Sequence, residues 1–189
     1  MSSLVLCIDF INDIVHPDGK ISHSAPYVDK YKVLEKANQA IDLARRKDIP
    51  IVHVKVGFSA NYLECPKQSP LFSSAQKYNA LQLGTWGTEF HQDLDVQSED
   101  RILVKHRVSA LYATPLATIL TANKVDTVLI CGVSTNMTID STTRELHDRD
   151  YSVVVLQDAC GAASLDIHEA TLANLSRLAK VIEVDELYK

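Results

Sequence analysis

The sequence predicts an α/β protein with a doubly wound, mostly parallel sheet. Two observations carry this prediction. Short apolar runs rich in β-branched residues alternate along the chain with segments of helical periodicity, which is the order of elements in a sheet covered by helices. Most of the runs are continuously apolar, as expected for parallel strands buried on both faces. The length of 189 residues fits a single domain over residues 1–189.

Six strands and four helices are expected in order along the chain. The apolar runs predict strands at residues 3–8, 51–56, 102–104, 127–131, 152–156 and 181–184. The helical patterns cover residues 31–47, 114–122, 136–150 and 166–180. In the first helix, Val33, Ala37, Ala40 and Ala44 form one apolar stripe, and Pro115 suits the first turn of the second.

One segment, residues 57–100, is too long for an ordinary connection between strands and carries the single tryptophan, Trp86. Long loops inside compact domains are usually functional or take part in interfaces. We therefore expect this segment to act as a lid or as part of an interface between subunits.

Composition and charge exclude several classes of protein. Hydrophobic residues make up 46% and charged residues 23%, which is typical of a soluble globular domain. The formal net charge of −5 disfavours nucleic acid and anionic membranes as partners. The four cysteines lack metal-finger or disulfide spacing, and no apolar stretch approaches a membrane span or a signal sequence. The expectation is a cytoplasmic protein with no nucleic-acid or membrane partner.

Polar residues follow three predicted strands at the ends where α/β sheets bind ligands. Asp9 ends the first strand, Lys105 follows the third, and the turn at residues 132–138 follows the fourth. Asp9 and Lys105 could form an ion pair, and the turn opens a helix whose first N–H groups could hold an oxyanion. Each also has a purely structural interpretation, as a helix cap, a solvated basic patch, or an ordinary strand–turn–helix connection.

Three motifs at these strand ends resemble those of the isochorismatase-like hydrolases, also called cysteine hydrolases. The motifs are DFINDI at residues 9–14, KHRVSAL at residues 105–111, and GVSTNMTIDSTTRE at residues 132–145. GTWGTEF at residues 84–90 and Asp158 after the fifth strand add to the likeness. The resemblance runs in order over essentially the whole chain, and its separated motifs make it specific.

The resemblance implies a three-layer, Rossmann-like fold with helices on both faces of a six-stranded sheet. It also implies that Asp9 is the general base, that Lys105 is its electrostatic partner, and that N–H groups of Ser134 and Thr138 form an oxyanion hole. A cis peptide bond would fall at Val133–Ser134. Thr135 would lie in the same binding turn.

Two aromatic residues, Trp86 and Tyr112, are further candidates for the binding pocket. They suggest a substrate with an aromatic or planar acyl group.

One departure from the family pattern affects the mechanism. Thr138 occupies the position of the family's nucleophilic cysteine, and the first motif lacks the family's glutamine and phenylalanine. A threonine hydroxyl is a much weaker nucleophile than a thiolate. The first hypothesis is a hydrolase that needs no thiol and acts on a small carboxylate, amide or vinyl-ether metabolite. In its vinyl-ether form, Asp9 is a general acid, as in the family's true isochorismatases.

A second hypothesis is a catalytically weakened binding or assembly protein that keeps the pocket. In either case we expect a small-molecule ligand, no cofactor, and a homodimer or homotetramer as in the family. No metal is expected, because the seven histidines are unclustered and the lone His53 lies inside an apolar strand.

Overall fold

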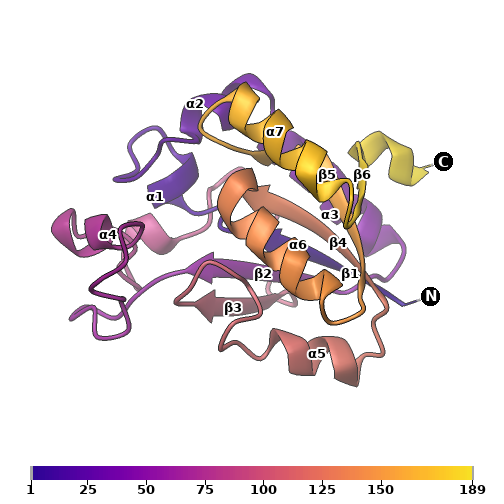
Figure 1. The fold of residues 1–189 in the computed structure, drawn as a ribbon, viewed down its shortest axis with the longest axis horizontal. Helices are drawn as coiled ribbons and strands as arrows, with labels where there is room; N and C mark the ends of the chain where they lie inside the picture. The colour runs from indigo at the N-terminus through magenta and orange to yellow at the C-terminus, as the bar shows by residue number, and fades with distance from the viewer. Residues whose placement is uncertain (1, 189) are drawn as a thin grey trace.

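The computed structural model describes residues 2–188, which form a three-layer α/β structure (Figure 1). The strands are β1 (Ser3–Ile8), β2 (Ile51–Val56), β3 (Arg101–Lys105), β4 (Thr127–Val133), β5 (Ser152–Gly161) and β6 (Lys180–Ile182). The α-helices are α1 (Asn12–Val15), α2 (Ala25–Lys30), α3 (Val33–Arg46), α4 (Ser73–Lys77), α5 (Leu116–Ala122), α6 (Asp140–His147) and α7 (Leu165–Leu175).

The six strands form one sheet in the order β3-β2-β1-β4-β5-β6, and every neighbouring pair is parallel. The predicted fold class is therefore confirmed. Strand order reverses between β1 and β4, which pair from Ser3–Thr127 to Ile8–Gly132. A switch point of this kind is where open α/β sheets leave a crevice beyond their carboxyl ends.

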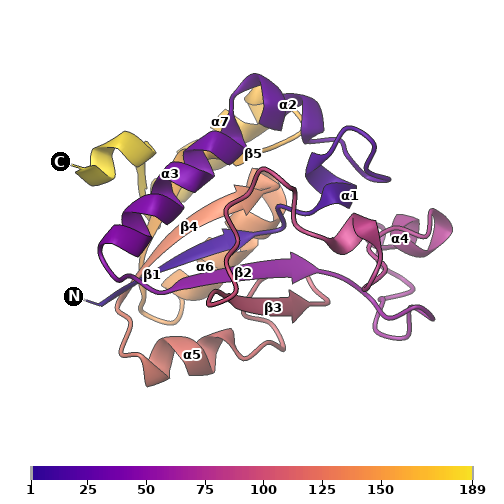
Figure 2. The ribbon, with the colours of Figure 1, turned by 180° about the vertical axis from the view of Figure 1, so that it is seen from behind.

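Helices cover both faces of the sheet. Helices α6 and α7 lie on the face nearer the viewer in Figure 1, and α3 lies on the opposite face, which Figure 2 brings forward. The helices divide between the two faces because the chain moves across the sheet in opposite directions in its two halves, from β1 to β3 and from β4 to β6. Right-handed crossovers in opposite directions place their helices on opposite faces. No helix in residues 2–188 is long and apolar enough to cross a membrane.

Most element boundaries differ from the predicted ones by a few residues. The helix predicted at 31–47 begins at Val33, because Lys32 adopts a left-handed conformation (φ 56°) that separates it from α2. The helix predicted at 136–150 begins with a π-helical turn, Thr135–Ile139, and ends before Asp150, which has φ 64°.

The C-terminal half shows further boundary differences. The strand predicted at 152–156 continues through two polar residues to Gly161. The helix predicted at 166–180 ends at Leu175, and its last predicted residue already belongs to β6. The apolar pattern does not mark the end of β5, because pairing with β4 shifts register around the polar residues and then resumes at Gly132–Cys160 and Val133–Gly161.

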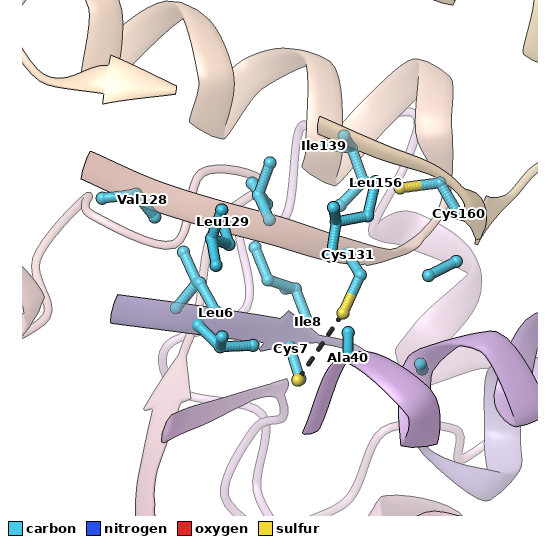
Figure 3. Packing of buried hydrophobic residues seen from close by; sticks show 14 of the residues in the cluster. Leu6, Cys7, Ile8, Ala40, Val128, Leu129, Cys131, Ile139, Leu156 and Cys160 are labelled. Atoms are coloured by element: carbon cyan, nitrogen blue, oxygen red, sulfur yellow. Dashed lines mark hydrogen bonds between the residues drawn. The ribbon is translucent and has the colours of Figure 1, made fainter. Parts of the chain in front are cut away.

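The main core lies between the sheet and its helices and includes side chains from β1 and β4 (Figure 3). Cys7 and Cys131 are direct neighbours on these two strands, with their Sγ atoms 3.6 Å apart. All four cysteines are buried free thiols. Contact with Cys7 and burial raise the pKa of the Cys131 thiol well above its usual range, and burial raises the pKa of Cys160 to about 12. These two thiols are therefore protonated at neutral pH.

Candidate active site

Asp9 directly follows β1 and is held rigidly at the switch point. Its backbone is in the left-handed region (φ 61°), which turns the chain sharply out of the strand. Its N–H donates to Val54 O at 2.8 Å, and its Oδ1 accepts the Val56 N–H at 2.7 Å. Only 2% of the residue is exposed. The neighbouring strand β2 thus fixes the carboxylate and leaves Oδ2 for other partners.

Lys105, the last residue of β3, reaches past β2 to that second oxygen. Its Nζ lies 2.8 Å from Asp9 Oδ2, and both side chains are almost fully buried. The same ammonium donates to the carbonyl oxygens of Arg107 at 3.1 Å and Val108 at 3.0 Å. The predicted proximity of Asp9 and Lys105 is confirmed as a buried ion pair.

Thr138 completes a three-residue cluster. Its Oγ1 donates a hydrogen bond to Asp9 Oδ2 at 3.0 Å and lies 3.4 Å from Lys105 Nζ. The residue is in the π-helical turn that follows β4, on the other side of β1 from Lys105. Strands far apart in sequence therefore bring a carboxylate, an ammonium and a hydroxyl into contact.

Strand β4 approaches β1 closely at Gly132, just before the turn that carries Ser134 and Thr138. Gly132 has φ 143°, and a Cβ atom there would lie 2.2 Å from the carbonyl oxygen of Ile8, so a side chain cannot fit. The peptide bond Val133–Ser134 is cis, as the family resemblance implied. Ser134 Oγ lies 3.2 Å from Ser24 Oγ, which joins the turn to the segment before α2.

Thr135 is fully buried and does not border the cavity at the cluster. Its Oγ1 lies 2.8 Å from Nδ1 of His168, which comes from α7. Burial lowers the pKa of His168, so its ring is neutral at physiological pH. Thr135 thus fixes the turn to α7 and not to the cavity. The sequence analysis missed His168 because nothing in the pattern of α7 distinguishes it from any other buried histidine.

A cavity of about 350 Å³ opens onto the cluster. Asp9, Lys105, Ser134 and Thr138 form its floor. Residues of the long segment 57–100, on and around α4, form much of its wall, among them Leu71 and Phe72. The segment is therefore part of the pocket, and its apolar residues were the missed signal. The pocket residues His23 and Ser24 carried no distinguishing signal in the sequence.

Two predicted pocket residues do not border this cavity. Trp86 is 46% exposed as a residue, and its ring packs edge-on against His16 with ring centroids 5.0 Å apart. The Trp86 carbonyl accepts a hydrogen bond from the side-chain amide of Asn12. Tyr112 is 59% exposed. The stretch around Trp86 is held on the α1 side by contacts with Asn12 and His16, so its ring cannot reach the pocket.

The described residues 2–188 contain no group of three or more His, Cys, Asp or Glu side chains placed to hold a metal ion. His53 is a core residue, as the isolated position in its strand indicated. Its Nε2 lies 3.1 Å from Asp100 Oδ2, and burial lowers its pKa.

Comparison with known proteins defines the class of this chain. Residues 3–186 match the Isochorismatase domain. The chain is 31% identical over 157 residues to the uncharacterized isochorismatase family protein YecD of Escherichia coli O157:H7, covering 82% of this chain and 81% of that protein. The fold and the sequence together show that the chain belongs to the isochorismatase family, whose members are hydrolases.

Two further relatives extend the comparison. Ureidoacrylate amidohydrolase RutB of Methylobacterium radiotolerans is 27% identical over 190 residues, covering 92% of this chain and 73% of that protein. The crystal structure of an isochorismatase-like hydrolase from Alkaliphilus metalliredigens superposes with a TM-score of 0.82 at 26% identity, over 99% of this chain and 97% of that one.

Proposed function

We propose that this protein hydrolyses a small amide or ester without a thiol nucleophile, with Asp9 as the acid–base residue. The observation that carries this proposal is the buried Asp9–Lys105 ion pair at the floor of a cavity. A buried charge pair is costly to maintain for stability alone, and it supplies both a proton acceptor and a positive charge at one point. The amidohydrolase relatives support cleavage of a C–N bond.

The proposed reaction uses water as the nucleophile. Asp9 takes a proton from a water molecule as its oxygen bonds to the substrate carbonyl carbon. The resulting oxyanion faces the N–H groups of the turn at Ser134 and Thr138. When the C–N or C–O bond breaks, the proton on Asp9 passes to the leaving group. Lys105 keeps the carboxylate oriented, and the Thr138 hydroxyl lines the pocket.

The vinyl-ether alternative has less support from the geometry. In that reaction Asp9 must begin protonated in order to donate a proton. Here the carboxylate accepts hydrogen bonds from Val56 N–H and Thr138 O–H and is paired with Lys105, an arrangement that suits the charged form. A general base is therefore the better-supported role for Asp9.

A second candidate mechanism makes Thr138 the nucleophile. The supporting observation is that its hydroxyl already donates to Asp9 Oδ2 at 3.0 Å, the contact needed to lose its proton to that carboxylate. The Lys105 ammonium, 3.4 Å away, would stabilise the developing alkoxide. An acyl-threonine would form and then be hydrolysed by water.

Three variants separate these mechanisms in a screen of small amides, esters and vinyl ethers. With water as nucleophile, Thr138→Ala should retain activity within about tenfold, equivalent to roughly 1.4 kcal/mol of barrier. Asp9→Asn should lower activity by about 10²–10⁴-fold. Complete loss in folded Thr138→Ala, with partial activity in Thr138→Ser, would assign the nucleophile to the hydroxyl. Unchanged activity in Asp9→Asn would refute both mechanisms.

The same screen tests the remaining alternative, a binding or assembly protein that has lost turnover. That alternative predicts ligand binding in the cavity without product formation from any substrate class. We also propose a homodimer or homotetramer, which light scattering would contradict by giving the 21.0 kDa mass of a single chain.

A further inference from the structure

We propose that the pocket selects uncharged substrates with an apolar acyl group and rejects substrates that carry a carboxylate. This inference rests on the proposed function, since it names the substrate class of the same site. It is drawn from the apolar cavity walls and from the hydrogen bonds that already occupy Lys105, the only lysine or arginine bordering the cavity within residues 2–188.

The walls are mostly apolar. Eleven of the eighteen lining residues are hydrocarbon, proline or methionine side chains, including Ile21, Leu71, Phe72, Ala75, Val108 and Met137. These six come from the segment before α2, from α4 and its approach, and from the two turns beyond β3 and β4. Apolar walls bind hydrocarbon by releasing water, but they give no compensation to a buried charge.

The only lysine or arginine that borders the cavity within residues 2–188 is Lys105, and its donors are already in use. An ammonium has three hydrogens. Lys105 directs them to Asp9 Oδ2, Arg107 O and Val108 O, at 2.8, 3.1 and 3.0 Å. A substrate carboxylate would have to displace one of these partners and would also lie beside the Asp9 carboxylate, which repels it.

The three serine side chains of the cavity also have partners inside the protein. Ser24 and Ser134 hydrogen-bond to each other, and the Ser74 hydroxyl donates to Leu71 O at 3.3 Å. The Arg107 guanidinium donates to the carbonyls of Glu64 and His106 and does not border the cavity. His23, which is exposed at the cavity, is the remaining group that could carry positive charge.

The test compares matched neutral and anionic amides. Butyramide is paired with succinamate, and benzamide with 4-carboxybenzamide, so that each pair differs mainly by one carboxylate. Ammonia release is measured at pH 8, and binding is followed separately by ligand-observed NMR. We expect kcat/KM for each neutral amide to exceed that of its anionic twin by about tenfold or more.

A positive charge placed on the cavity wall should largely remove this preference. Leu71 borders the cavity and is 45% exposed, so Leu71→Arg should fold and raise kcat/KM for the anionic twins by about tenfold. Leu63→Arg adds the same charge to the same segment at a site that is 77% exposed and does not border the cavity, and it should leave the ratio unchanged.

The outcomes separate this inference from the proposed function. Equal or better hydrolysis of the anionic twins by the unmodified protein would overturn the inference while the proposed function stood. If no amide is hydrolysed but the neutral members bind more tightly than their twins, amide hydrolysis fails and the inference stands. Equal binding of both twins, or no binding of either, would overturn the inference.

Discussion

Removal of the Lys105 ammonium is the most informative perturbation of stability. Lys105→Met keeps an unbranched side chain of similar length, so packing is largely preserved. The change leaves the buried Asp9 carboxylate without its counter-charge and leaves the carbonyls of Arg107 and Val108 without a hydrogen-bond donor. Breaking a buried pair in this way costs about 3–5 kcal/mol, a large part of the 5–15 kcal/mol of a typical domain.

A double-mutant cycle with Asp9→Asn isolates the contribution of the Asp9–Lys105 charge interaction to the free energy of unfolding. Asparagine tolerates the left-handed conformation of residue 9 (φ 61°), so the backbone should be unaffected. In the Asp9→Asn background, Lys105→Met leaves no carboxylate without a counter-charge, and only the two carbonyls lose their donor. In that background the buried Lys105 ammonium already lacks its counter-charge, so the cost of removing it should fall by about 2 kcal/mol. The expected coupling between the two positions is therefore about 2 kcal/mol.

The assay is urea unfolding of the four proteins of the cycle, followed by far-ultraviolet circular dichroism at pH 7.5. A single protein concentration is used throughout, because assembly of subunits would add to apparent stability. Equal costs of Lys105→Met in both backgrounds, within about 0.5 kcal/mol, would refute the view that the ion pair carries the effect.

Two further predictions concern reactivity and pH. Thr138→Cys should place a thiol beside Lys105 in the open cavity, and iodoacetamide should label residue 138 faster than the buried Cys65; equal labelling rates would contradict the site geometry. Burial lowers the pKa of His53 and His168, so the unfolded chain takes up their protons first as pH falls. Stability should be full above about pH 6.5 and decrease below it, by up to about 1.4 kcal/mol per pH unit for each histidine, with a shallower decrease in His53→Gln. Stability that rises between pH 7 and 5.5 in thermal unfolding would contradict this.

The candidate site divides into residues that local pattern could find and residues that it could not. Asp9, Lys105 and the turn at Ser134 and Thr138 each follow an apolar strand, and parallel strands direct their carboxyl ends to one edge. Their convergence was predictable for that reason. The family motifs suggested the roles that are proposed above, but no local pattern gives the bond from Thr138 to the same carboxylate oxygen that Lys105 contacts.

Sequence alone determined the fold class, the family, and which strand ends carry polar residues, because hydrophobic periodicity and motif spacing are properties of short stretches of the chain. Only the tertiary structure decided which residues wall the cavity. It placed Leu71 and Phe72 against the cluster and held Trp86 away from it, through contacts with Asn12 and His16. The physical reason is that a long irregular segment has no periodicity of its own, so its side chains are positioned by the partners that it meets in the folded protein.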